Sequence, residues 1–245
     1  MVKVLSIGNS FSQDSQKWLH NILCDAGIDN ICVNLYVGGC TLKRHYDNLV
    51  TGNPDYDWEV NGGISEKKIS ITEALKADKW DIVTLQQASH ESGRPQSYYP
   101  YLPVLLSAVK EYCPDAKCYI NKTWAYPEYS KNDIFARYGY NSDEMYRRLS
   151  DAYTLASKLT GLPLIKVGDL INTLRKSDTF PKDAPLYRDD LHLSHLYGRY
   201  AAALVWAKTL FGVDPCSAVF VPEFEGERAE ESVLSLIKEA VSAQF

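Results

Sequence analysis

Residues 2–10, VKVLSIGNS, begin the chain with an apolar, β-branched run that ends at Gly8. The stretch that follows, residues 14–27 (DSQKWLHNILCDAG), carries apolar residues such as Trp18 and Ile22 at the spacing of one helix face. A short apolar run, a glycine and an amphipathic stretch together predict a buried strand, a tight turn and a helix.

The same alternation continues along the chain. Further strands are predicted over residues 31–37, 81–85, 117–121 and 163–167. Helices are predicted over residues 41–50, from about 71, and over 98–112, 142–159, 192–212 and 227–243. Residues 52–71, rich in Gly, Asn, Asp and Trp, predict a hairpin or an ordered loop. Strands that alternate with helices predict a three-layer α/β/α sandwich with a central parallel sheet. Because no linker-like or repeated segment interrupts the pattern, we expect one domain over residues 1–245.

Composition and charge exclude several functional classes. A net charge of −5 argues against a nucleic-acid-binding protein, and a small, weakly polar molecule is the expected partner. The six cysteines lack the paired spacing of a zinc site, and mostly buried free thiols are expected. No stretch approaches the roughly 20 apolar residues that span a bilayer. Without a recognisable signal peptide the sequence as given predicts a cytoplasmic protein, or a periplasmic or secreted one if a leader was removed. The oligomeric state stays open.

Ser10 follows the first predicted strand directly. In a parallel α/β sheet, ligands bind beyond the carboxyl ends of the strands, and a helix N-terminus favours developing negative charge. Ser10 is therefore a candidate nucleophile. The alternative is that Ser10 or Ser12 merely caps the first helix, since serine is a preferred cap residue.

Asp189 and His192, near the other end of the chain, supply the partners that a nucleophilic serine needs. The histidine would accept the hydroxyl proton, and a carboxylate three residues earlier would orient the imidazole. A cap for a following helix is the alternative interpretation of this Asp-x-x-His pattern.

These two blocks, GNS at residues 8–10 and Asp-x-x-His at 189–192, resemble the first and fifth blocks of the SGNH (GDSL-type) hydrolases. Asn9 replaces the usual aspartate. GNSFS, with QQAS at residues 86–89, looks most similar to an uncharacterised bacterial branch of that superfamily. The resemblance implies a flavodoxin-like SGNH hydrolase fold.

The resemblance also implies an oxyanion hole. Its expected donors are the Ser10 amide, a glycine amide after the second strand, and a side-chain amide after the third. Gly39 suits the second position, with Gly38 as the alternative. The third block departs from the family's G-x-N-D: Gln87 is favoured, Gln86 comes second, and an ungapped match points to His90. Gln86 and His90 are also candidates for substrate binding.

Other polar and aromatic residues have simpler interpretations. Asp14 would complement the N-terminus of the first helix. His195 is read as a helix residue, and neither His20 nor His45 has the carboxylate neighbours of a metal site. The aromatic residues after the fourth strand either stack on a sugar ring or are ordinary rim aromatics; they are Trp124, Tyr126 and Tyr129.

The sequence thus predicts a serine esterase that cleaves a small-molecule ester, with an O-acetyl group on a carbohydrate favoured. Such a mechanism needs no metal or organic cofactor. A lipid esterase or thioesterase of the same fold, and a glycan-binding domain without activity, are the alternatives. A flavodoxin-like nucleotide-binding domain is disfavoured, because neither phosphate-binding glycine motif occurs at the first turn.

Overall fold

The computed structural model describes residues 1–65 and 67–245, and its centre is a mostly parallel sheet. Among these residues the sheet has seven strands in the order β4-β3-β2-β1-β5-β6-β7. The strands are β1 (Val2–Gly8), β2 (Asn30–Tyr36), β3 (Tyr56–Val60), β4 (Lys68–Ile69), β5 (Ile82–Leu85), β6 (Lys117–Asn121) and β7 (Leu164–Ile165). From β2 to β7 across the sheet the strands are parallel, whereas β3 and β4 form an antiparallel edge.

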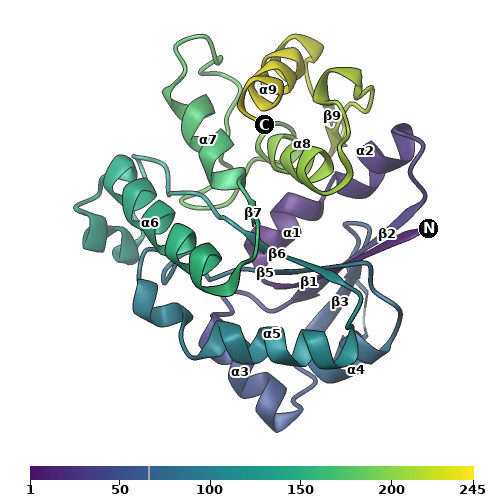
Figure 1. Ribbon diagram of the computed structural model, residues 1–245. Helices are drawn as coiled ribbons and strands as arrows, with labels where there is room; N and C mark the ends of the chain where they lie inside the picture. Colours follow the sequence, from purple (N-terminus) through teal and green to yellow (C-terminus); the bar gives the residue numbers. More distant parts are fainter. Residues whose placement is uncertain (66) are drawn as a thin grey trace.

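Helices cover both faces of the sheet (Figure 1). One face carries α3 (Leu42–Thr51), α4 (Ile71–Lys76) and α5 (Tyr101–Tyr112). The other carries α1 (Ser10–Gln16), α2 (Leu19–Asp25), α7 (Val167–Lys176), α8 (Gly198–Phe211) and α9 (Glu231–Gln244). The long α6 (Ser142–Thr160) lies beside the β7 edge. The fold is therefore the three-layer α/β/α sandwich that the alternation of strands and helices predicts.

Several predicted boundaries shift for physical reasons. The predicted first helix is two helices, α1 and α2, which break at Trp18, where the indole Nε1 donates to the His195 carbonyl at 2.8 Å. The predicted helix 98–112 begins only at Tyr101, because Pro100 disfavours a helical conformation at the residue before it. A 3₁₀ helix, η1 (Pro95–Tyr98), precedes it.

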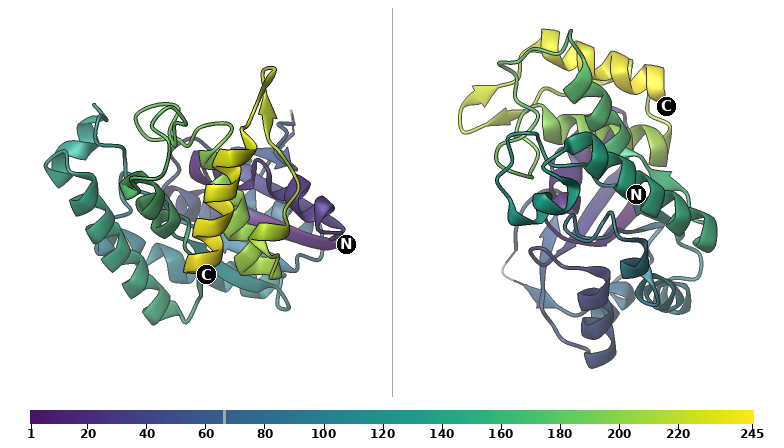
Figure 2. Two further views of the ribbon diagram at one scale, coloured as in Figure 1. Left: turned by 90° about the horizontal axis from the view of Figure 1, so that it is seen from above. Right: turned by 90° about the vertical axis from the view of Figure 1, so that its left-hand side faces the viewer.

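The hairpin predicted within residues 52–71 is β3 and β4; residue 66 lies outside the described residues. Near the C-terminus, the predicted helix 227–243 begins at Glu231, because residues 223–228 form a second hairpin. Its strands are β8 (Glu223–Phe224) and β9 (Glu227–Arg228). Figure 2 shows this hairpin projecting from the body of the molecule beside α9.

The register of the central strands sets the position of the candidate site. Gly8 of β1 pairs with Tyr36 of β2, and Ile7 pairs with Leu85 of β5, so three strands end at one level. The segments that follow them therefore meet at the carboxyl edge of the sheet. Gly8 is needed here, because a Cβ atom would come within 2.0 Å of Ser12 Oγ.

Candidate active site

Ser10 is the first residue of α1, just beyond the carboxyl end of β1. The N-cap residue of this helix is Asn9, whose Oδ1 accepts a hydrogen bond from the Phe11 amide at 2.9 Å, and Ser12 completes a capping box by accepting the Asn9 amide. The Ser10 hydroxyl is thus not used for capping. As the first helical residue, Ser10 also has an amide without an intrahelical acceptor.

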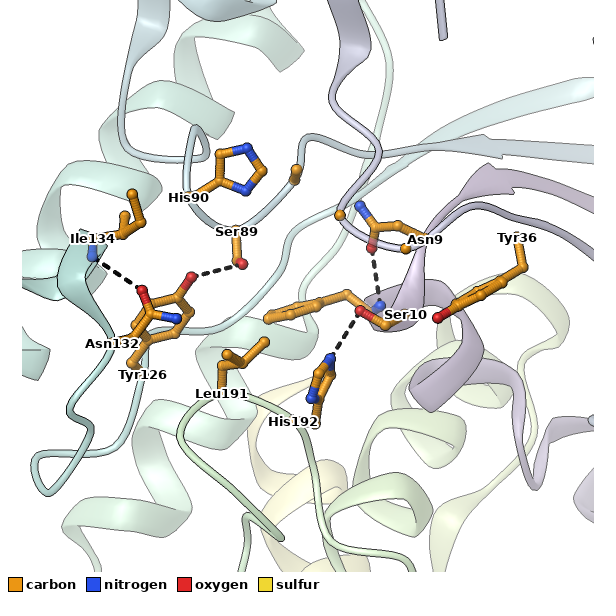
Figure 3. Close-up of a pocket in the computed structure, with 14 residues that line it drawn as sticks. Asn9, Ser10, Tyr36, Ser89, His90, Tyr126, Asn132, Ile134, Leu191 and His192 are labelled. Carbon is orange, nitrogen blue, oxygen red and sulfur yellow. Dashed lines mark hydrogen bonds between the residues drawn. The ribbon is translucent and has the colours of Figure 1, made fainter. Parts of the chain in front are cut away.

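His192 lies beside Ser10 although 182 positions separate them, with Nε2 2.9 Å from the serine Oγ (Figure 3). Its Nδ1 is 2.8 Å from Asp189 Oδ2. The other oxygen, Oδ1, accepts the backbone amides of Leu191 and His192 at 2.9 and 2.7 Å. The structure therefore joins Ser10, His192 and Asp189 in one hydrogen-bonded line, an arrangement that can remove the serine proton.

Hydrogen bonding favours the charged form of Asp189. Burial opposes its ionisation, but the hydrogen bonds from the two backbone amides and from the imidazole outweigh burial and lower the pKa of the carboxyl group. A carboxylate that stays ionised can hold Nδ1–H of His192 and stabilise an imidazolium ion.

Asp14 anchors the loop that carries this pair. It is fully buried, and its Oδ1 lies 2.9 Å from Arg188 Nη1 and 2.8 Å from Arg199 Nε. Its Oδ2 accepts the Leu193 amide at 2.9 Å. Asp14 is the fifth residue of α1 and contacts arginines, so its main role is to tie the nucleophile's helix to the loop of His192. This differs from the expected complement to the helix N-terminus.

Trp124 supports the same loop from the other side. Its side chain is fully buried, its Nε1 donates to the Leu191 carbonyl at 2.8 Å, and its ring stacks on Phe11 with centroids 4.2 Å apart. A ring with no exposed surface cannot stack on a sugar, so the expected substrate contact of Trp124 is wrong in this structure. Tyr129, by contrast, is 62% exposed, outside the cavity beside Ser10.

Backbone amides beside Ser10 fit the expected oxyanion donors. Gly38 and Gly39, after β2, both line the cavity that contains Ser10. Gly39 has a φ of +61°, a conformation that favours glycine. Both glycines stay candidates for the second donor.

Gln87 is placed differently from its expected role. Its Oε1 accepts the amides of Leu42 and Ala88, each at 2.9 Å, and its Nε2 donates to Ser97 at 2.9 Å (carbonyl) and 3.0 Å (hydroxyl). It does not line the cavity beside Ser10. Both polar atoms of the side-chain amide already form hydrogen bonds within the protein, so the geometry does not support Gln87 as an oxyanion donor.

Gln86 is also buried and belongs to a chain of amides beneath the site. The Trp206 indole, which can only donate, bonds to Asn121 Oδ1 at 3.2 Å, and Asn121 Nδ2 donates to Gln86 Oε1 at 2.7 Å. Gln86 Nε2 in turn donates to Asn9 Oδ1 at 2.7 Å. This direction leaves Asn9 Nδ2 to donate to the Cys40 carbonyl at 3.1 Å, next to Gly39. Gln86 therefore orients Asn9, and it does not line the cavity beside Ser10.

The cavity at Ser10 has a volume of about 280 Å³. Figure 3 shows Ser89, Tyr126, Asn132 and Ile134 on the side away from Tyr36, with Ser10 between. Of the residues expected from the sequence, His90 lines this cavity, and burial lowers the pKa of its imidazole. Sequence reasoning missed Tyr36, although its place at the end of β2 was a usable signal. Asn132 caps a 3₁₀ helix, η2 (Asp133–Tyr138), to which Ile134 belongs, and no sequence motif marked either residue.

The remaining histidines and cysteines lie elsewhere. His45 is buried against Tyr56, His20 contacts Asn30, and His195 precedes α8 instead of lying within it, with its ring stacked on Phe224 at 3.8 Å. All six cysteines are free; Cys32, Cys40 and Cys113 are buried and Cys118 is partly so, whereas Cys24 and Cys216 are exposed. Within residues 1–65 and 67–245, no three His, Cys, Asp or Glu side chains gather as metal ligands would. None of the helices in those ranges is long and apolar enough to cross a membrane.

Comparisons with known proteins identify both a family and a fold. The family model described as "Domain of unknown function (DUF4886)" matches residues 3–240. A DUF4886 family protein from Bacteroides uniformis ATCC 8492 has a crystal structure that superposes with a TM-score of 0.90 at 32% identity, over 99% of this chain and 93% of that one. No protein with a curated description matches the sequence.

More distant structures share the fold. A Slackia heliotrinireducens protein provisionally assigned as an SGNH hydrolase matches with a TM-score of 0.60 at 23% identity, over 85% of this chain and 98% of that one. A family 3 carbohydrate esterase from Clostridium thermocellum matches with a TM-score of 0.52 at 14% identity, over 84% of this chain and 94% of that one. The SGNH hydrolase fold that the sequence motifs predict is confirmed.

Proposed function

Because this chain belongs to the DUF4886 family and has the fold of the SGNH hydrolases, we propose that it is a serine hydrolase that cleaves small carboxylic esters. The observation that supports this most strongly is the hydrogen-bonded line from Ser10 to His192 to Asp189, with distances of 2.9 and 2.8 Å. A module that only binds a ligand has no chemical need for this arrangement.

In the proposed mechanism, Ser10 Oγ attacks the ester carbonyl while His192 Nε2 accepts its proton. The negative charge that develops on the carbonyl oxygen is stabilised by the Ser10 amide and by a glycine amide, Gly39 or Gly38. His192 then returns the proton to the leaving alcohol, which gives an acyl-enzyme. A water molecule, deprotonated by His192, attacks the acyl-enzyme; the acid is released as His192 returns the proton to Ser10 Oγ. Asp189 holds Nδ1–H of the imidazole throughout.

His90 is the favoured residue of the third block for a contact with the substrate. Of the three third-block candidates, Gln86, Gln87 and His90, it alone lines the cavity, and a pKa lowered by burial keeps its ring neutral, with one N–H to donate. We assign it a substrate-binding role and leave the oxyanion itself to the backbone amides.

The proposed substrate is a short acyl ester, an acetyl group on a carbohydrate. A cavity of about 280 Å³ lies at the small end of the range for ligand pockets, which suits a two-carbon acyl group better than a lipid chain. Apolar side chains line it beside polar ones, as an acyl group next to a hydroxylated alcohol requires; the apolar ones include Phe11, Ala88, Ile134 and Leu191.

The test is hydrolysis of p-nitrophenyl acetate by the purified chain and by its Ser10→Ala and His192→Ala variants. We expect turnover by the wild type and at least about a thousandfold loss in both variants, because the triad acts as a unit. Ser107→Ala, on the exposed side of α5, is the matched control and should keep full activity. Unchanged turnover in Ser10→Ala, with all four proteins folded, would reject the assignment.

A further inference from the structure

A second cavity lies at the same carboxyl edge of the sheet, on the α3 and α5 side. Its volume is about 370 Å³, and its walls come from the loop after β2, the loop after β5 and the start of α5. His90 lines both this side cavity and the cavity that contains Ser10. The two cavities are therefore neighbours that meet at His90.

The charged residues of the side cavity are paired with one another or with close neighbours. Arg94 Nη1 lies 2.9 and 2.8 Å from the two carboxylate oxygens of Glu91, and Lys43 Nζ lies 2.6 Å from Asp47 Oδ2. Each cation that lines the cavity thus already has a carboxylate partner. This balance disfavours a phosphate or carboxylate ligand, which would need an uncompensated cation.

The neutral lining of the side cavity consists of groups that form hydrogen bonds. The described residues that line it include no Leu, Ile, Val or Phe, in contrast to the cavity at Ser10. Gln87 and Ser97 are tied to each other, whereas Gln96 is exposed and Tyr101 is half-buried with its ring tilted against Tyr46. Amide and phenol groups next to an aromatic ring are suited to a polyhydroxylated ring and unsuited to an acyl chain.

We infer that the side cavity is a subsite for a neutral sugar residue linked to the sugar whose ester is cleaved at Ser10. This inference rests on the proposed esterase function and extends it: the substrate is an acylated oligosaccharide. Gln96 and Tyr101 contact the additional sugar, and His90 lies between the two rings.

The experiment compares two substrates on each variant: p-nitrophenyl acetate, which is too small to reach the side cavity, and O-acetylated xylotriose. The measured quantity is the ratio of their kcat/KM values. We expect wild type to favour the oligosaccharide, and expect Tyr101→Ala and Gln96→Ala each to lower the ratio about fivefold, mainly through KM for the oligosaccharide. Tyr140→Ala, a substitution of an exposed tyrosine outside both cavities, is the matched control and should leave the ratio unchanged.

The outcomes separate the two proposals. If wild type hydrolyses p-nitrophenyl acetate but the ratio is unchanged in both variants, the subsite is rejected and the esterase function stands. If Tyr101→Ala loses activity equally on both substrates, Tyr101 has a structural role. Gln96→Ala then decides, because its exposed side chain does not support the fold: a lowered ratio supports the subsite and an unchanged ratio rejects it. Failure of wild type to hydrolyse either ester rejects both proposals.

Discussion

The two segments that form the Ser10–His192–Asp189 line are held in place in different ways. The Ser10 turn depends largely on its neighbours in sequence: β1 ends at Gly8, Asn9 caps α1, and Ser12 Oγ lies 3.0 Å from the Asn9 amide. Strand, cap and helix are local features, and the long-range contacts from Gln86 to Asn9 and from Ser12 to Asn34 add to them.

The loop of Asp189 and His192 contains little regular structure and depends on distant residues. A single bridge pairs Tyr187 with Leu193, the Asp189 carboxylate accepts two amides of its own loop, and further supports come from far along the chain. Asp14 bonds to the Leu193 amide and to Arg188, and Trp124 bonds to the Leu191 carbonyl. The nucleophile therefore relies more on regular structure within its own segment, and the base more on long-range polar contacts. Substitutions at these contacts should affect the base selectively.

The largest effect is expected for Asp14→Asn. The substitution removes the charge partner of Arg199, which is buried, and weakens the contact to the loop of His192. Leaving a buried ion without its partner typically costs 3–5 kcal/mol, so we expect the free energy of unfolding to fall by about 3 kcal/mol and kcat/KM to fall as well. Urea denaturation and p-nitrophenyl acetate hydrolysis measure the two effects.

Asp151→Asn is the matched control for this substitution. Asp151 makes an exposed ion pair with Arg147 at 3.2 Å on α6, and an exposed pair contributes less than about 1 kcal/mol. A stability loss in Asp14→Asn no larger than in this control would show that Asp14 does not anchor the loop.

The contrast between local and distant supports also explains what the sequence could predict. Strands, turns and the position of Ser10 follow from short-range patterns, and the parallel sheet then brings the strand ends together. The sequence also contains the pattern of helix α7, since Val167, Leu170, Ile171 and Leu174 have helical spacing. The predicted strand 163–167, however, includes the first residue of this helix. The burial of Trp124 and the use of the Gln87 amide by Ser97 depend on tertiary packing, which no local pattern records.

Asn9→Asp tests the Ser10 turn, at the point where the chain of amides reaches its helix cap, and should have the next largest effect. Aspartate is the usual residue of the resembled family at this position, yet here the donor-only Trp206 indole fixes the direction of the amide chain. Asn9 must accept from Gln86 and donate to Cys40. A carboxylate would face the Cys40 carbonyl without a hydrogen and displace the Cys40–Thr41 peptide, next to Gly39. We expect a loss of about tenfold or more in kcat/KM with p-nitrophenyl acetate.

Asn141→Asp provides the control for that experiment, because Asn141 caps α6 through the same kind of contact, with its Oδ1 2.9 Å from the Glu144 amide. Aspartate is an equally good cap there, and activity should stay at the wild-type level. If Asn9→Asp matches this control, the amide chain does not position the loop of Gly38 and Gly39.

A smaller effect is expected for Trp124→Phe, which keeps the ring packed on Phe11 but removes the hydrogen bond to the Leu191 carbonyl. Such a bond contributes about 1 kcal/mol, and the loosened loop should lower kcat/KM about fivefold. Trp80→Phe removes an equivalent buried bond, from Nε1 to the Ala74 carbonyl at 2.9 Å, on the opposite face of the sheet. Equal activity of the two variants would contradict a selective role of Trp124.

The smallest effect is a pH-dependent difference in stability between wild type and Asp189→Asn. The folded pKa of Asp189 lies below the ordinary value of about 3.9, so its carboxylate stabilises the fold above that pH, and this contribution is lost as the pH falls through the folded pKa. Urea denaturation should therefore show wild type more stable than the variant at pH 7, with the difference vanishing in strong acid. A difference that persists unchanged at low pH would mean that the loop is held without the charge of Asp189, and that its distant contacts to Asp14 and Trp124 suffice.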